Sequence, residues 1–242
     1  MVPQQAIGFW RGFSAPFGAA SSLLRQPRSW PYVLLPTVVF LLIEAAFIAV
    51  AWRFLAPWID ARLPGGGSTQ SLVVKLLSAV VMAFAGWIAA IVLGPAISAP
   101  ALERIVDITE AALEAPARAP LGFVAEFWCA MRSMFWSTAL TLPVIVGLSL
   151  LELLFPPLSV VVTPLKLLLG ALGLAWGLFD YPLTLRGMGA RERFAFMKRH
   201  WTVVLGFGTG FSLLFWVPCF GILMLPLGVA GATRLYWALE RQ

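Results

Sequence analysis

Charged residues are scarce in this chain of 242 residues: they make up 12% of it, whereas 60% of the residues are apolar. An ordinary soluble domain is about a quarter charged. Two segments, 76–102 and 201–233, contain no Asp, Glu, Lys or Arg, and both are longer than the roughly 18 residues that indicate membrane insertion. The composition therefore excludes a water-soluble globule and predicts an integral membrane protein.

Cysteine and histidine are almost absent. Cys129 and Cys219 lie far apart among apolar neighbours, and His200 is the only histidine. This excludes a disulfide framework, a Cys-x-x-Cys site and most acid–base triads. The chain also lacks a phosphate-binding loop, a His-Glu-x-x-His motif and a nucleophile elbow. We expect no enzyme, no cofactor and no metal site, and we interpret His200 as an interfacial neighbour of Trp201 rather than a ligand.

Positive charge is in excess, at 17 Lys and Arg against 11 Asp and Glu. In a membrane protein such an excess marks the cytoplasmic side and contacts lipid, so we expect no nucleic-acid partner. With hairpins that return to the side they left, 13 positive residues lie on the side of the N-terminus and three, Arg53, Arg62 and Lys75, lie opposite. Both termini are predicted to be cytoplasmic. Residues 1–24 lack the pattern of a cleavable signal peptide.

Apolar periodicity predicts an all-α integral membrane protein, with residues 1–242 forming a single membrane domain. Glu103, Asp107, Glu110 and Glu114 would share one face of an amphipathic surface helix that ends at Pro116. The predicted elements are an interfacial helix at 7–24, spanning helices at 31–55 and 72–97, the amphipathic helix at 100–115, and helical hairpins at 133–179 and 201–239.

The two hairpins have apolar turns, around Phe155-Pro156-Pro157 and around Val217-Pro218-Cys219. Their helices at 164–179 and 201–216 have 16 residues each, about 24 Å, which is short of a hydrocarbon core of about 30 Å. We therefore expect hairpins that penetrate the bilayer partway, with full spanning as the alternative. Glu152 and Lys166 flank the first turn and are expected to pair with each other.

The start of the first spanning helix is the best candidate for an anion site. Arg25, Arg28, Ser29 and Trp30 lie where unpaired N–H groups and the positive end of the helix dipole favour an oxyanion. The alternative is that these arginines contact lipid phosphates and set the topology. Glu44, midway along the same helix, is an intramembrane carboxylate and thus a functional candidate, with a structural carboxylate as the alternative.

Two other features have a plainer interpretation. The cytoplasmic basic run contains Glu192 as its only acid and is expected to be a solvated, lipid-facing surface rather than an anion funnel. Gly206-Phe207-Gly208-Thr209-Gly210 has no strand before it, so it indicates close helix packing rather than dinucleotide binding. Gly8 and Gly12 form a weaker pattern of the same kind. The basic run consists of Arg186, Arg191, Arg193, Lys198 and Arg199.

Several strings occur in an order that resembles the CysZ sulfate permease and etoposide-induced membrane protein family. They include Leu34-Leu35-Pro36, Ile97-Ser98-Ala99-Pro100, Asp180-Tyr181-Pro182, Gly206-Phe207-Gly208, Met224-Leu225-Pro226 and Val229-Ala230-Gly231-Ala232-Thr233. The resemblance implies two long spanning helices with two hemi-penetrating hairpins, a homo-oligomer, and sulfate uptake through the inner membrane for cysteine biosynthesis. A non-transporting membrane scaffold is the alternative within the same family.

The sequence departs from the family at one place. The CysZ branch carries Pro-Gly-Leu-Arg-Arg before its first spanning helix, where backbone amides and arginine bind sulfate. Alignment on Leu34-Leu35-Pro36 puts Pro27 on that proline, and Arg28-Ser29-Trp30-Pro31 then replaces Gly-Leu-Arg-Arg. Neither arginine is in register, so Arg25 and Arg28 would have to supply the charge.

Overall fold

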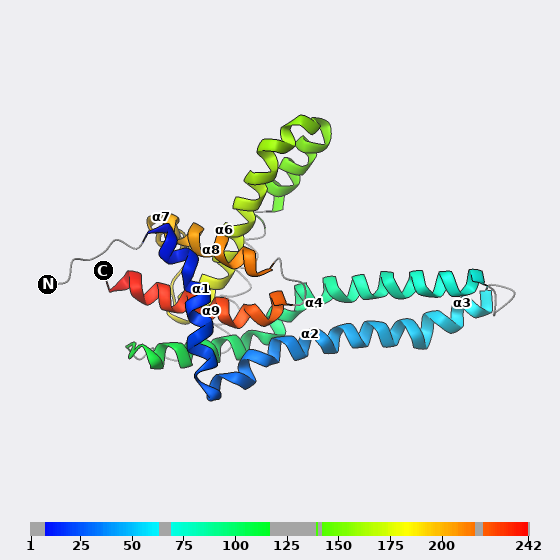
Figure 1. The fold of residues 1–242 in the computed structure, drawn as a ribbon, viewed down its shortest axis with the longest axis horizontal. Coiled ribbons are helices and arrows are strands. Elements are labelled where there is room, and N and C mark those ends of the chain that lie inside the picture. Colours follow the sequence, from blue (N-terminus) through cyan, green and yellow to red (C-terminus); the bar gives the residue numbers. More distant parts are fainter. Residues whose placement is uncertain (1–7, 63–68, 117–138, 140–141, 216–219, 242) are drawn as a thin grey trace. The chain divides into compact units, whose positions relative to one another are not determined.

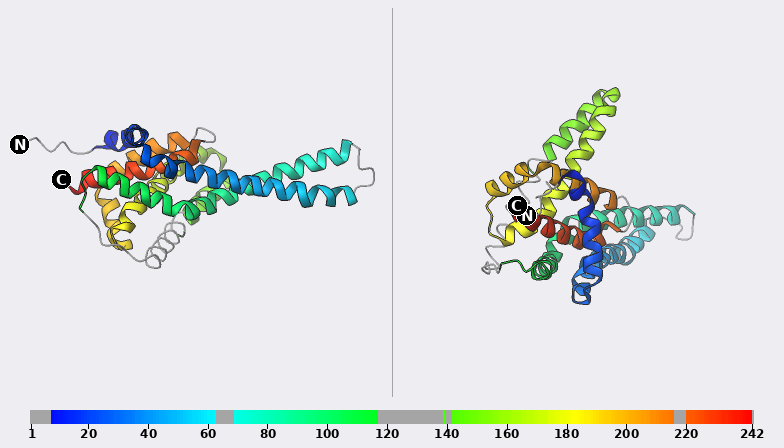
Figure 2. Two further views of the ribbon diagram at one scale, coloured as in Figure 1. Left: turned by 90° about the horizontal axis from the view of Figure 1, so that it is seen from below. Right: turned by 60° about the vertical axis from the view of Figure 1, so that its left-hand side comes forward.

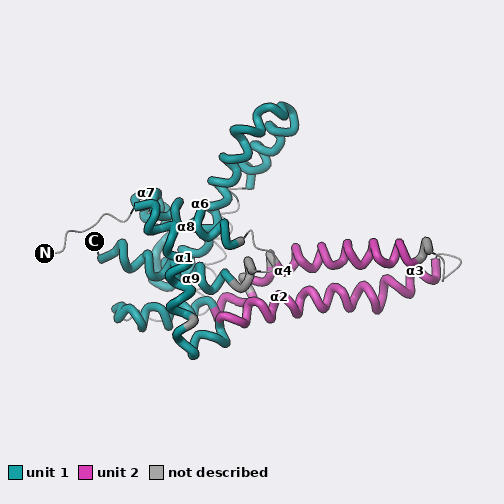
Figure 3. The backbone as a smooth tube through the Cα atoms, in the orientation of Figure 1, with its two compact units in different colours: residues 1–32, 102–242 teal, residues 33–101 magenta. Residues whose placement is uncertain are grey.

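The computed structural model describes residues 8–62, 69–116, 139, 142–215 and 220–241. Every regular element in these ranges is helical (Figure 1), which confirms the predicted all-α fold class. Three of the helices, at Pro27–Arg62, Leu72–Ala90 and Pro156–Leu185, are long and apolar enough to cross a membrane. The described residues form two compact units, residues 33–101 and the remainder of the chain (Figure 3).

The smaller unit, 33–101, consists of two long antiparallel helical segments (Figures 1 and 3). The first contains most of α2 (Trp30–Val50), the π-helical turn η2 (Ala51–Leu55) and α3 (Ala56–Arg62). The second is part of α4 (Thr69–Ala112). Only 6% of the apolar window in each segment is buried, so apolar side chains cover the outside of this unit. Such a surface suits lipid acyl chains.

Two boundaries differ from the sequence prediction in this part of the chain. The segment predicted at 31–55 continues in helical form to Arg62. The helices predicted separately at 72–97 and 100–115 form one helix, α4, which continues through Pro100 and ends at Ala112, before Pro116. The prediction of two helices was wrong because a proline removes one backbone hydrogen bond, and membrane helices tolerate that loss when the bonds on either side persist.

The larger unit is built around α1 (Phe9–Leu24), the second half of α6 (Ser159–Leu185), α8 (Trp201–Phe215) and α9 (Phe220–Glu240). Helix α1 packs on α8 and α9, and so does α6, as the two further views also show (Figure 2). Phe179, Phe207 and Phe211 are fully buried between them. The rings of Phe179 and Phe207 meet edge to face at 5.2 Å, a favourable aromatic geometry.

Glycines set the spacing between α1 and α8. A Cβ added at Gly206 would collide with the carbonyl of Phe9, and one added at Gly210 would collide with the carbonyl of Phe13. From the other side, a Cβ at Gly12 would collide with the carbonyl of Val203. The two backbones are therefore in direct contact, which confirms the close packing predicted for residues 206–210.

The first predicted hairpin consists of the helix Leu142–Leu154, the 3-10 turn η3 (Pro156–Leu158) and α6. The turn is shorter than the sequence indicated, because α6 begins at Ser159 and Pro164 lies inside it. With 27 residues, α6 is not the short helix predicted at 164–179, so its length gives no reason for partial penetration. Lys166 does donate to Glu152, and Thr163 adds a hydrogen bond of 3.0 Å to the same carboxylate, which confirms the predicted pair.

The basic helix α7 (Ala190–Arg199) connects to α8 through His200. Glu192 in its first turn reaches back to the start of the helix, where its carboxylate accepts the N–H of Gly189 at 2.7 Å. The second predicted hairpin is represented by α8 and α9, and its turn at Val217-Pro218-Cys219 lies outside the described residues. Cys129 and the predicted start of the first hairpin at 133 lie outside them as well.

Candidate functional site

The predicted anion site lies in the turn that follows α1. Helix α1 is capped by Arg25, and the chain enters a 3-10 turn, η1 (Pro27–Ser29), before α2 begins at Trp30. Ser29 is fully buried, and its hydroxyl lies within hydrogen-bonding distance of the carbonyls of Leu23, at 3.0 Å, and Gln26, at 2.8 Å. Its hydroxyl proton therefore closes the turn and is not available to an anion.

The backbone donors at this point are also partly used. The N–H of Ser29 donates to the carbonyl of Gln26 at 3.0 Å, and the N–H of Trp30 donates to the carbonyl of Pro27. The sequence prediction counted these two N–H groups among the unpaired donors that could bind an oxyanion. The 3-10 turn ahead of α2 reduces what the helix N-terminus could contribute, so an anion at this turn would depend on the arginine side chains.

Arg25 and Arg28 are the free charges of the turn. Both are exposed, and neither has an ion pair or side-chain hydrogen bond with the described residues. The indole of Trp30 is 52% exposed beside them. A guanidinium can form two parallel hydrogen bonds with an oxyanion, and an unpaired one can do so without first breaking a salt bridge.

Glu44 lies in the smaller unit, on the side of α2 that meets α4. A Cβ added at Gly86 would lie 2.8 Å from its Oε2 atom and 3.0 Å from the Cβ of Phe47. The carboxylate thus occupies space that only glycine leaves open. Among the described residues, Glu44 has no ion pair, which separates it from Glu152 and Glu110.

A second charged cluster, absent from the sequence prediction, surrounds Glu110 near the end of α4. Its Oε1 atom accepts Nε and Nη2 of Arg186, at 3.2 and 3.0 Å, and Nε1 of Trp237 at 3.2 Å. The guanidinium of Arg186 also lies over the Trp237 ring, 4.4 Å from its centroid. Glu110 is 7% exposed, so the prediction that its carboxylate lies on the outer face of an amphipathic surface helix was wrong. The cluster joins the ends of α4, α6 and α9.

Arg193 is the second charged residue whose environment was predicted wrongly. It is 2% exposed, donates through Nη1 to Asp180 and through Nε to the carbonyl of Met188 at 2.8 Å. Arg191, Lys198 and Arg199 are exposed, as the prediction of a solvated surface required. Burial and the neighbouring Arg199 lower the pKa of His200 below its ordinary value, and its ring packs against Phe196.

The family model described as Sulfate transporter CysZ/Etoposide-induced protein 2.4 matches residues 15–226. This chain belongs to that family. A sulfate transporter CysZ of Pseudomonas fluorescens (strain Pf0-1) is 28% identical over 230 residues, which cover 90% of each chain. A sulfate transporter CysZ of Pseudomonas paraeruginosa (strain PA7) is 27% identical over 231 residues, covering 92% of this chain and 93% of the relative.

The short sequence strings that the chain shares with this transporter family lie at helix contacts in the structure. Asp180, in the Asp-Tyr-Pro string, is the partner of Arg193. In the Gly-Phe-Gly string, Gly206 faces α1, and a Cβ added at Gly208 would collide with the carbonyl of Ala171 in α6. Thr233 is fully buried, and its hydroxyl donates to the carbonyl of Val229 at 2.8 Å. These family strings hold the helix bundle together.

Proposed function

We propose that this protein carries sulfate or a closely related small oxyanion across the inner membrane, without ATP hydrolysis and without enzymatic activity. The observation that carries the proposal is the pair of exposed, unpaired guanidinium groups, Arg25 and Arg28, in the turn before α2. That turn opens the apolar span Pro27–Arg62. The names of the relatives, sulfate transporter CysZ, support sulfate as the anion.

Each residue of the predicted site has a distinct role in this proposal. Arg25 and Arg28 attract and bind the oxyanion through charge-assisted hydrogen bonds, each worth about 1.5 to 3 kcal/mol. Ser29 positions Arg28 by holding η1 against the end of α1. Trp30 places an indole at the level of the lipid headgroups, where tryptophan is favoured. Glu44 acts farther along the same span, where an unpaired carboxylate is expensive and implies function.

The surroundings of the protein form part of the same proposal. Both termini are cytoplasmic, on the count of 13 positive residues against three. The chain acts as a single membrane domain and as a homo-oligomer, in contact with membrane lipids. A cytoplasmic reporter fused to the C-terminus should be active, and an external reporter at the same position should be silent. A reproducible mixture of both activities would contradict a single orientation.

The experiment that tests the function uses the purified full-length chain. Direct binding of radiolabelled sulfate, with selenate and phosphate as competitors, is followed by sulfate uptake into proteoliposomes. We expect saturable binding that selenate displaces and uptake that needs no ATP. The rival function is a membrane scaffold, which would show neither binding nor uptake although the protein is folded and inserted.

A further inference from the structure

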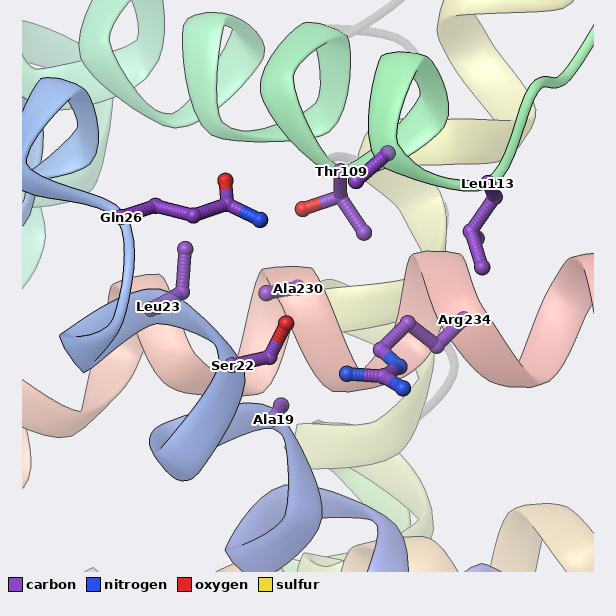
Figure 4. A pocket seen from close by; sticks show the side chains of 9 residues that line it. Ala19, Ser22, Leu23, Gln26, Thr109, Leu113, Ala230 and Arg234 are labelled. Carbon is purple, nitrogen blue, oxygen red and sulfur yellow. The ribbon is translucent and has the colours of Figure 1, made fainter.

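Beside the predicted site, the larger unit contains a pocket of about 60 Å³. Its walls come from the end of α1, the last turn of α4 and the middle of α9 (Figure 4). Its polar lining consists of Ser22, Gln26, Thr109 and Arg234. A water molecule needs roughly 10 to 15 Å³ of such space, so the pocket has room for several waters or for one ion with four oxygen atoms.

Arg234 supplies the positive charge of the pocket. Its guanidinium reaches across from α9 toward Ser22 on α1 (Figure 4). Within the described ranges Arg234 has neither an ion pair nor a side-chain hydrogen bond. Glu110, the acid next to Thr109, accepts hydrogen bonds from Arg186 and Trp237. Its negative charge is therefore neutralised by Arg186 and not by Arg234.

Two neutral donors share the pocket with Arg234. Ser14 and Ser21 of α1 donate to the carbonyls three residues earlier, at 3.3 and 2.9 Å, but Ser22 makes no such bond within the described part of the chain. Its hydroxyl is therefore available. The Gln26 amide points across the pocket toward Thr109 (Figure 4). Thr109 donates its proton to the carbonyl of Ile105 at 2.7 Å, so it can only accept.

Helix ends oppose an anion here, since α1 and α4 both turn their negative C-terminal ends toward the pocket. At both helix ends, hydrogen-bond donors satisfy one of the terminal carbonyl groups. The carbonyl of Leu23 accepts the Gln26 N–H at 3.0 Å, and the Ser29 hydroxyl lies at the same distance from it. The carbonyl of Leu113 accepts Nη2 of Arg241 at 2.7 Å. The remaining unfavourable field makes a cation in this pocket necessary for anion binding, and Arg234 is that cation.

We infer that this pocket is a second binding site for a tetrahedral oxyanion, with Arg234 as the charged ligand and Ser22 and Gln26 as neutral donors. The ligand is a free sulfate or phosphate ion, or the phosphate of a lipid headgroup, since all present the same four-oxygen chemistry. The inference rests on the proposed function only for the choice of sulfate as a probe. Gln26 lies in the pocket wall and directly follows Arg25 in the chain, so the pocket adjoins the Arg25–Ser29 turn.

The test measures radiolabelled sulfate affinity of the detergent-purified full-length chain, normalised to folded protein. Arg234→Gln is expected to weaken binding about ten-fold or more, because it removes a charge-assisted hydrogen bond, and Ser22→Ala a few-fold. Arg104→Gln makes the same change in net charge at a side chain that does not line the pocket, and it should have no effect. If Arg234→Gln does not fold, Ala112→Leu at the pocket wall narrows the site and gives the same comparison.

Further measurements distinguish a free anion from a lipid headgroup as the ligand, and they separate failure of the pocket from failure of transport. Native mass spectrometry that finds a phospholipid on the wild type but not on Arg234→Gln supports the pocket with a headgroup as its ligand. Unchanged sulfate affinity and unchanged lipid content in Arg234→Gln and Ser22→Ala overturn the pocket, whatever Arg28→Ala does. A wild-type protein that binds neither ligand overturns it too. Proteoliposome uptake tests the transport function separately, and it can succeed when the pocket fails.

Discussion

Arg193 in α7 donates through its guanidinium to the carboxylate of Asp180 in α6, across 13 residues of sequence. The arginine side chain is 2% exposed and the aspartate side chain 17% exposed. Removal of one partner leaves a buried charge without its counter-charge, which typically destabilises a protein by about 3 to 5 kcal/mol. The pair therefore anchors α7 to the bundle.

Asp180→Asn is the corresponding prediction. It keeps the shape of the side chain and removes the charge, so the thermal midpoint of the purified protein should fall strongly. Arg191→Gln, on the exposed side of the same helix, is the matched control and should leave the midpoint unchanged. Fluorescence-detected size-exclusion after heating measures both. Equal midpoints for wild type and Asp180→Asn would show that the pair contributes nothing to stability.

Gly206→Ala should separate α1 from α8. The new methyl group would collide with the Phe9 carbonyl, and overpacking of this kind costs about 1 to 3 kcal/mol. Gly18→Ala is the control, since nothing lies within 4 Å of a Cβ at that position. It should be neutral or stabilising by roughly 0.4 to 1 kcal/mol, because alanine restricts the unfolded chain. Equal effects of the two substitutions would refute direct backbone contact.

Glu152 and Lys166 should behave as a unit. The residues around them at the hairpin tip are apolar and strongly exposed, among them Leu153 and Val160 at 76% and 78%. A single Lys166→Met or Glu152→Gln leaves one charge in apolar surroundings and should reduce membrane yield. The double variant should recover most of that yield, because no unpaired charge remains. Additive losses in the double variant would show that the two side chains do not depend on each other.

Arg28 provides the sharpest test of the proposed transport site. Arg28→Ala removes a charge-assisted hydrogen bond worth about 1.5 to 3 kcal/mol and should weaken sulfate binding roughly ten-fold or more. Arg28→Lys keeps the charge and loses the paired donors of the guanidinium. Its sulfate affinity should therefore lie between that of the wild type and that of Arg28→Ala. A lipid-anchoring arginine would lower the yield of Arg28→Ala without changing affinity per folded molecule. Unchanged affinity in both variants would remove Arg28 from the site.

The sequence predicted those features that depend on nearby residues. Long apolar runs fixed the helices of the smaller unit, and Glu152 and Lys166 were predictable as a pair because a short turn brings them together. The packing role of Gly206 was also predictable, although its partner Phe9 was not. Glu110 and Arg186 are 76 residues apart, and nothing in either local pattern indicates that they meet. The pocket at Arg234 was unpredictable for the same reason, since three distant helices form it.

Gly86 determines how α2 and α4 are aligned along their length. The carboxylate of Glu44 fits where α4 has no side chain, and its neighbours one turn away, Met82 and Ala90, both carry one. A slide of one helical turn, about 5.4 Å, would press the carboxylate against a methionine or an alanine. The missing side chain at Gly86 thus sets the register between the two helices of the smaller unit and holds the Glu44 carboxylate at one point along α4.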